Sequence, residues 1–78
     1  MKYAIQASYY MWNEETKMEY EHWEYLALDE HKIFIFEDNV TERTKLFSTA
    51  KAAGDYVDKH FGAGYIRCSF SKIRIVEV

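Results

Sequence analysis

The sequence contains no proline, only three glycines and a single cysteine among its 78 residues. No stretch therefore has the composition of a Pro- or Gly-rich linker. A separate core usually needs on the order of 50 residues or more, so the chain has room for one domain, residues 1–78. Cys68 has no partner for an internal disulfide, which fits a reducing compartment.

Long hydrophobic runs are also missing. No apolar run exceeds the four residues Ile33 to Phe36, whereas a membrane-spanning helix needs ~20. A secretory signal needs ~7 to 15 apolar residues after a charged start, and the alternating residues after Lys2 do not provide them. With a mean hydropathy of −0.44, we expect a soluble, cytoplasmic protein with no membrane partner.

Aromatic residues are abundant, at 18% of the chain, and supply enough bulk for the core of a small domain. Charge is uneven along the sequence. Ten acidic residues outnumber three basic ones before Arg43, and seven basic residues outnumber three acidic ones from Arg43 onward. These blocks would form separate surfaces only if the two segments lie on different sides of the fold.

The first segment alternates with the period of two that is typical of a half-buried strand. Tyr3, Ile5 and Ala7 share one parity, and Gln6 and Ser8 share the other. The polar residues 13–17 contain no bulky apolar side chain, so they predict a hairpin turn into the next strand.

Met18 to Leu28 mixes helix formers with strand-forming rings, and we predict a strand, with a helix as the alternative. Its alternation is interrupted. A one-residue bulge near Glu21 and His22 would place Glu19 and Glu24 on the solvent face and the large rings on the buried face.

The uninterrupted apolar run Ile33 to Phe36 predicts a central strand that is covered on both faces. A helix is predicted from Thr49 to Phe61, capped by Ser48 or Thr49. The glycine at position 62 should end this helix. Gly54 should cost about 1 kcal/mol in the helix interior, unless it allows a close approach to the sheet.

The last segment, Tyr65 to Val78, returns to alternation and predicts one or two closing strands. Ile66, Cys68 and Phe70 share one parity and Ile73 and Ile75 the other, so a bulge or turn is expected at residues 71–72. The predicted fold class is α+β, with an antiparallel sheet of four or five strands and one helix on one face, in the order β-β-β-α-β.

The residues that most often carry catalysis or bind metals form no known motif in this sequence. The single cysteine and the scattered histidines lack the clustered spacing of zinc ligands, and neighbouring carboxylates lie in predicted turns, where they are hydrated. Cys68 alternates with apolar residues and is interpreted as a buried thiol. We therefore expect no enzyme, no metal and no cofactor; the residues weighed are His22, His31, His60, Glu14, Glu15, Asp29, Glu30 and Cys68.

The surface suggests a protein partner. Tyr10 and Trp12 lie on the solvent-leaning parity of the first strand, beside the acidic turn. Exposed rings next to carboxylates suit a partner with a basic groove, whereas the alternative is that either ring packs across the second sheet face. The predicted partner-binding residues are Tyr10, Trp12, Glu14, Glu15, Glu19 and Glu24.

Residues Phe47 to Tyr56 follow the pattern F-x-T-x-x-x-A-x-x-Y, which resembles the strand-to-helix step of many short phage and mobile-element proteins. The layout of the whole chain is similar to theirs, and among them the chain resembles the phage anti-CRISPR proteins. This resemblance implies a non-enzymatic inhibitor in the host cytoplasm. It would use an acidic and aromatic surface to occlude a nucleic-acid-binding or assembly site of a host defence complex.

Two other hypotheses stay open. In the first, the protein binds nucleic acid or acts as a regulator through Arg67, Lys72 and Arg74 on the closing strands, although a pI near 5.5 opposes non-specific binding. In the second, the protein is a homodimeric structural phage component whose closing strand pairs with its twin.

Overall fold

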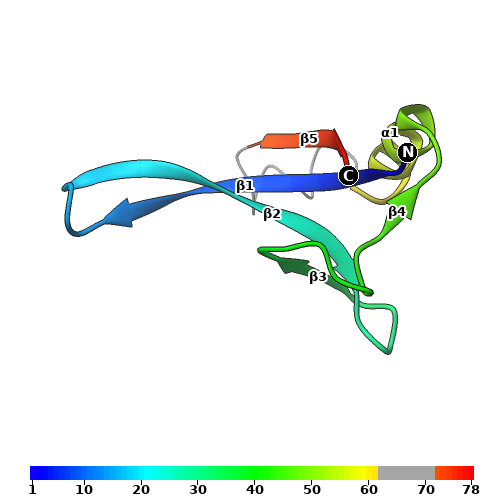
Figure 1. The fold of residues 1–78 in the computed structure, drawn as a ribbon, viewed down its shortest axis with the longest axis horizontal. Coiled ribbons are helices and arrows are strands. Elements are labelled where there is room, and N and C mark those ends of the chain that lie inside the picture. Colours follow the sequence, from blue (N-terminus) through cyan, green and yellow to red (C-terminus); the bar gives the residue numbers. More distant parts are fainter. Residues whose placement is uncertain (62–71) are drawn as a thin grey trace.

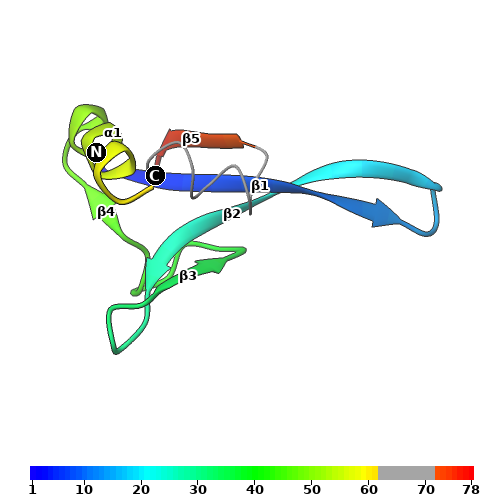
Figure 2. The ribbon, with the colours of Figure 1, turned by 180° about the vertical axis from the view of Figure 1, so that it is seen from behind.

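The computed structural model describes residues 1–61 and 72–78. Its elements follow the order β-β-β-β-α-β, which confirms the predicted α+β class and adds a short strand before the helix. Figures 1 and 2 show a long hairpin that runs the length of the molecule, with the helix and both termini at one end. The elements are β1 (Tyr3–Asn13), β2 (Met18–Leu28), β3 (Phe34–Glu37), β4 (Leu46–Phe47), α1 (Ala50–His60) and β5 (Lys72–Glu77).

Strands β1 and β2 form the predicted hairpin. The Asn13 side chain closes the turn, because its Oδ1 accepts hydrogen bonds from the amides of Glu15 at 2.9 Å and Thr16 at 3.2 Å. The amide of Lys17 donates to the Asn13 carbonyl at 2.8 Å, with Lys17 at a φ of 58°. This turn fixes the register, so Asn13 lies opposite Met18.

The register then continues without interruption to Gln6 opposite Tyr25. The bulge predicted near Glu21 and His22 is therefore absent, and that prediction is wrong. In an unbroken strand, Glu24 shares its face with His22, while Trp23 shares the other face with Glu19.

The sheet has the order β3-β2-β1-β4, and β5 pairs with β1. Among the described strands, β3 lies at an edge and pairs only with β2, so the prediction of a central strand is wrong. Its two phenylalanines pack against the core, and Ile33, just before the strand, is exposed. The apolar run therefore consists of one face that packs on the core and an exposed residue, Ile33, that precedes the strand.

Residues 43–47 lie where β1 and β2 separate. The amide of Leu28 donates to the Arg43 carbonyl and that of Lys45 to the Leu26 carbonyl, each at 3.0 Å. The next two residues, which form β4, pair with Tyr3 and Ala4 of β1. This segment supplies hydrogen-bond partners to both strands after they have stopped pairing with each other.

Helix α1 begins after Thr49, whose Oγ1 accepts a hydrogen bond from the Ala52 amide at 3.1 Å. This confirms Thr49 as the cap. The helix packs on the sheet face that carries Ile5 and Leu26, through Ala53 and its neighbours. The buried members of this core are Ile5, Leu26, Ala53 and Phe61, and the half-buried ones are Phe34, Phe36, Phe47, Tyr56, Val57 and Ile73.

The C-terminal predictions are tested only in part. Strand β5 confirms the last closing strand and places Ile73 opposite Ala7. The predicted strand with Ile66, Cys68 and Phe70, the stop at position 62 and the first residue of the bulge or turn predicted at residues 71–72 fall outside the described residues.

Replacing Gly54 with alanine is expected to stabilise the protein. A Cβ at this position would lie 3.7 Å from Ile75 Cδ1, an ordinary van der Waals contact. Alanine restricts the unfolded chain more than glycine does, so the free energy of unfolding should rise by about 0.5 to 1 kcal/mol. Urea unfolding monitored by circular dichroism measures this change, and a lower free energy for the variant would show that the helix needs the glycine to approach β5.

Candidate functional site

The distal half of the β1–β2 hairpin projects away from the rest of the molecule (Figures 1 and 2). We call residues 9–22 the hairpin arm. Here β1 and β2 pair with each other from Tyr9 opposite His22 to the turn, whereas β5 pairs with β1 only as far as Ser8. Among the described strands, none pairs with the arm as a third strand.

Large hydrophobic side chains are concentrated on the hairpin arm. Five of the eleven exposed ones in the described part of the chain belong to these 14 residues, so the concentration is not an average property of the surface. Trp12 is 53% exposed and Met18 is 65% exposed. Exposed rings and methionines gathered on one projection are typical of interaction surfaces. The five are Tyr10, Met11, Trp12, Met18 and Tyr20.

One face of the arm carries rings and carboxylates together. Tyr10 and Trp12 lie on this face, opposite Glu21 and Glu19 respectively. Of the two alternatives left open for Tyr10 and Trp12, exposure and packing across the second sheet face, the structure shows exposure, since about half of each side chain is accessible. Their exposure places two potential anchors beside carboxylates.

The acidic residues of the arm differ in how they are neutralised. Glu14 forms an exposed ion pair with Lys17 at 3.2 Å, and Glu21 lies 3.3 Å from Lys72. Within residues 1–61 and 72–78, Glu15 and Glu19 form no ion pair. These two carboxylates therefore keep their charge available to a partner.

Glu24 lies apart from this group, on the other face of β2. Its Oε2 is 3.9 Å from His22 Nε2, and its side chain is 18% exposed. Partial burial raises the pKa of Tyr9, helped by a hydrogen bond to Glu24 and by the negative charge of that carboxylate. The fold thus brings Tyr10, Trp12, Glu14, Glu15 and Glu19 together on one projection and places Glu24 at its base, facing the other way.

The closing-strand cations contact the protein's own groups. Arg74 lies over the ring of Trp23, with Cζ 3.8 Å from the ring centroid, and its Nε donates to Gln6 Oε1 at 2.7 Å. Lys72 pairs with Glu21, as described above. The third residue of the nucleic-acid hypothesis, Arg67, lies outside the described residues. These contacts cover Trp23 and reduce the positive charge that Lys72 and Arg74 offer to phosphates.

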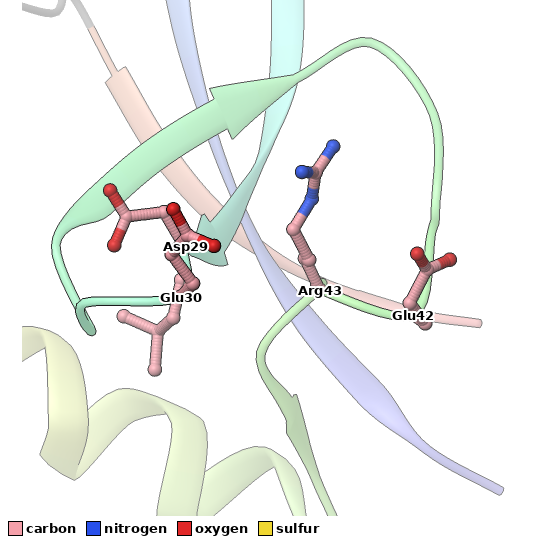
Figure 3. A pocket seen from close by; sticks show the side chains of 5 residues that line it. Asp29, Glu30, Glu42 and Arg43 are labelled. Atoms are coloured by element: carbon pink, nitrogen blue, oxygen red, sulfur yellow. The ribbon is translucent and has the colours of Figure 1, made fainter.

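A shallow pocket lies beside the turn between β2 and β3 and is lined by Leu28, Asp29, Glu30, Glu42 and Arg43 (Figure 3). Several of its polar groups are already bonded within the fold. Arg43 Nη2 donates to Glu37 at 2.8 Å, and Asp29 Oδ1 accepts hydrogen bonds from the amides of His31 and Ile33. These bonds hold the neighbouring loops, so we assign Asp29 and Arg43 a structural role.

Two features escaped the sequence reasoning. Met11 and Tyr20 share the face that carries Ile5 nearer the helix, so alternation predicts them to be buried, but they are exposed because the arm extends beyond the core. The grouping of His22 and Glu24 with Asp38 joins residues 14 to 16 positions apart. The register of the β2–β3 pairing, with Tyr25 opposite Glu37, brings them together and carries no sequence signal.

Comparisons of the chain with protein-family models, with curated proteins and with solved structures found no match. Within residues 1–61 and 72–78, no helix has the length and hydrophobicity needed to cross a lipid bilayer. Function is therefore inferred from the residues of the hairpin arm.

Proposed function

We propose that this protein is a non-enzymatic inhibitor that binds a protein partner through its hairpin arm and occludes a basic surface on that partner. The observation that supports this proposal most directly is the arm itself, where exposed rings lie beside two unneutralised carboxylates on a projecting ribbon. A two-stranded ribbon has the width to enter a groove that a flat sheet could not enter.

The rings and the carboxylates have different roles in this proposal. Trp12 and Tyr10 would supply most of the affinity, because aromatic side chains dominate the energy of protein interfaces. Glu15 and Glu19 would speed association with a basic surface and select against acidic ones. They would compete there with nucleic-acid phosphates for lysine and arginine side chains.

The proposed class of partner follows from the resemblance to anti-CRISPR proteins. It is a nucleic-acid-handling host defence complex in the cytoplasm of the host cell. Such a complex holds its nucleic acid with lysine and arginine side chains, which suits the carboxylates of the arm. The nucleic-acid alternative is less well supported, because Arg74 and Lys72 both contact groups of the same chain.

The experiment uses the full chain and a panel of purified CRISPR effector complexes of different types. At stoichiometric concentrations, the chain should prevent one of them from binding its target DNA, as measured by gel shift. In the double variant Glu15→Lys/Glu19→Lys, association with that effector should be about tenfold slower at low salt and less sensitive to added salt. Biolayer interferometry at several salt concentrations measures both effects.

A second double variant, Glu42→Lys/Asp58→Lys, serves as the control. It changes the net charge by the same amount at two exposed carboxylates outside the arm. Its association rate should stay close to that of the wild type. Equal losses in the two variants would assign the effect to overall charge, and a gel shift of free DNA or RNA by the chain alone would favour the nucleic-acid hypothesis. Inhibition of no effector in the panel would contradict the proposed partner class.

A further inference from the structure

A histidine and two carboxylates converge at the base of the hairpin arm, on the face opposite Trp12. His22 and Glu24 project from the same face of β2, and Asp38 follows directly after β3. His22 Nε2 lies 2.8 Å from Asp38 Oδ1 and 3.9 Å from Glu24 Oε2. One ligand atom from each of the three residues lies within 4.8 Å of the other two.

Neighbouring side chains hold this group in place. The rings of Tyr9 and Tyr20 contact the imidazole of His22 edge-on, with centroids 5.4 and 6.5 Å away. The side chain of Glu24 is hydrogen-bonded to that of Tyr9. The orientation of both β2 ligands is thus fixed by side chains outside the group, as is usual for the ligands of protein metal sites.

The charge of the group also favours a cation. Within residues 1–61 and 72–78, no lysine or arginine forms an ion pair with Glu24 or Asp38. The two carboxylates together carry a charge of −2, with Glu24 half-buried and Asp38 exposed. A divalent cation would neutralise this charge completely.

The spacing fits a tetrahedral transition-metal ion. Bonds of about 2.0 to 2.2 Å to nitrogen and oxygen place neighbouring ligands of a tetrahedral zinc ion about 3.4 Å apart. The separations from His22 Nε2 to Asp38 Oδ1 and Glu24 Oε2, 2.8 and 3.9 Å, lie on either side of this value. The ligand atoms of Glu24 and Asp38 lie within 4.8 Å of each other, so a relative movement of up to about 1.4 Å brings all three within bonding distance. The imidazole selects zinc over the hard cations Mg²⁺ and Ca²⁺, which prefer oxygen ligands alone.

We propose that His22, Glu24 and Asp38 form a zinc site with a water molecule as the fourth ligand. The ion bonds to the lone pair of His22 Nε2, so the ring proton resides on Nδ1 in the bound state. Zinc then replaces the direct hydrogen bond between His22 and Asp38. The bound ion joins the base of the arm to the loop after β3, which limits the motion of the arm relative to the sheet.

The test is isothermal titration calorimetry of the tag-free, chelator-treated protein with zinc chloride. One equivalent of zinc should bind, and His22→Gln and Asp38→Asn should each weaken binding at least tenfold. Zinc should also raise the thermal unfolding midpoint of the wild type, and EDTA should reverse this rise. Neither variant removes a residue of the hydrophobic core, and circular dichroism should show that each is folded.

His31→Gln is the matched control. His31 lies 3.5 Å from Glu30, but within the described part of the chain this exposed pair has no third ligand, so loss of His31 should leave zinc binding unchanged. Cys68→Ser removes the only thiol of the chain and should also leave binding unchanged. The proposal is overturned if the wild type binds no stoichiometric zinc. It is equally overturned if Cys68→Ser or His31→Gln abolishes binding, or if His22→Gln retains it.

Discussion

The variant Trp12→Ala is expected to bind the partner about 100-fold more weakly while keeping nearly the full free energy of unfolding. Truncation of a central aromatic anchor commonly costs about 2 to 4 kcal/mol of binding energy, and about 2.7 kcal/mol corresponds to 100-fold. Trp12 lies on the projecting arm and is 53% exposed, so its ring contributes little to the core. Titration calorimetry with the effector that the chain inhibits and urea unfolding of the free protein measure the two quantities separately.

Trp23→Ala is the control for this prediction, because it removes the same ring from a covered position. The ring of Trp23 lies under Arg74, so its loss should lower the free energy of unfolding by about 2 kcal/mol. The two tryptophans should therefore separate binding from stability. Unchanged affinity in Trp12→Ala would remove the arm from the interface, and a large loss of stability would show that Trp12 supports the fold.

Leu26→Ala should have the largest effect on the fold itself, lowering the free energy of unfolding by about 3 kcal/mol. Leu26 is fully buried and contributes to the core beneath the helix. A domain of this length has a total stability of roughly 4 to 12 kcal/mol. This single substitution therefore removes a large share of it, as urea unfolding would show.

Leu46→Ala makes the same chemical change at a side chain that is 40% exposed. This substitution should lower the free energy of unfolding by less than about 1 kcal/mol, because it removes less buried apolar surface than Leu26→Ala does. Similar losses at the two leucines would contradict the core described here, in which α1 covers the face that carries Ile5 and Leu26.

Elements with a strong local signal were predicted closely. The alternation around Ile5 and the polar turn after Trp12 are sufficient to define the hairpin, because both depend on neighbouring residues. The helix was equally accessible, since Thr49 caps it and Ala53 begins its apolar face. In each case, local chemistry and tertiary packing favour the same structure.

The errors arose where a neighbour distant in sequence decides the environment. A bulge was placed in β2 to keep Glu24 out of the core and the rings out of solvent. The structure instead places Glu24 beside His22 and Tyr9, and covers Trp23 with Arg74 from β5. No pattern within residues 18–28 predicts a contact with a guanidinium group that lies some 50 positions later in the sequence.

In the candidate site, too, local sequence predicts some features, and residues distant in the sequence decide the others. Tyr10 and Trp12 share the parity of Gln6 and Ser8, which are buried, so parity alone did not decide their exposure, whereas the acidic turn followed from its composition. Which carboxylates stay unneutralised was not predictable, because Lys72 approaches Glu21 only through the pairing of β5 with β1. The sequence therefore indicated the segment that carries the rings and carboxylates. Within the described residues, the fold leaves Glu15 and Glu19 as its carboxylates without an ion pair.

The pairing of β5 with β1 also has a consequence for biosynthesis. Tyr3 lies opposite Glu77, so β1 is synthesised well before the strand that pairs with its second edge. Until then, the nascent chain exposes an open strand edge that invites pairing with other chains. The early hairpin depends on local contacts alone, whereas completion of the sheet is a late step with a large sequence separation.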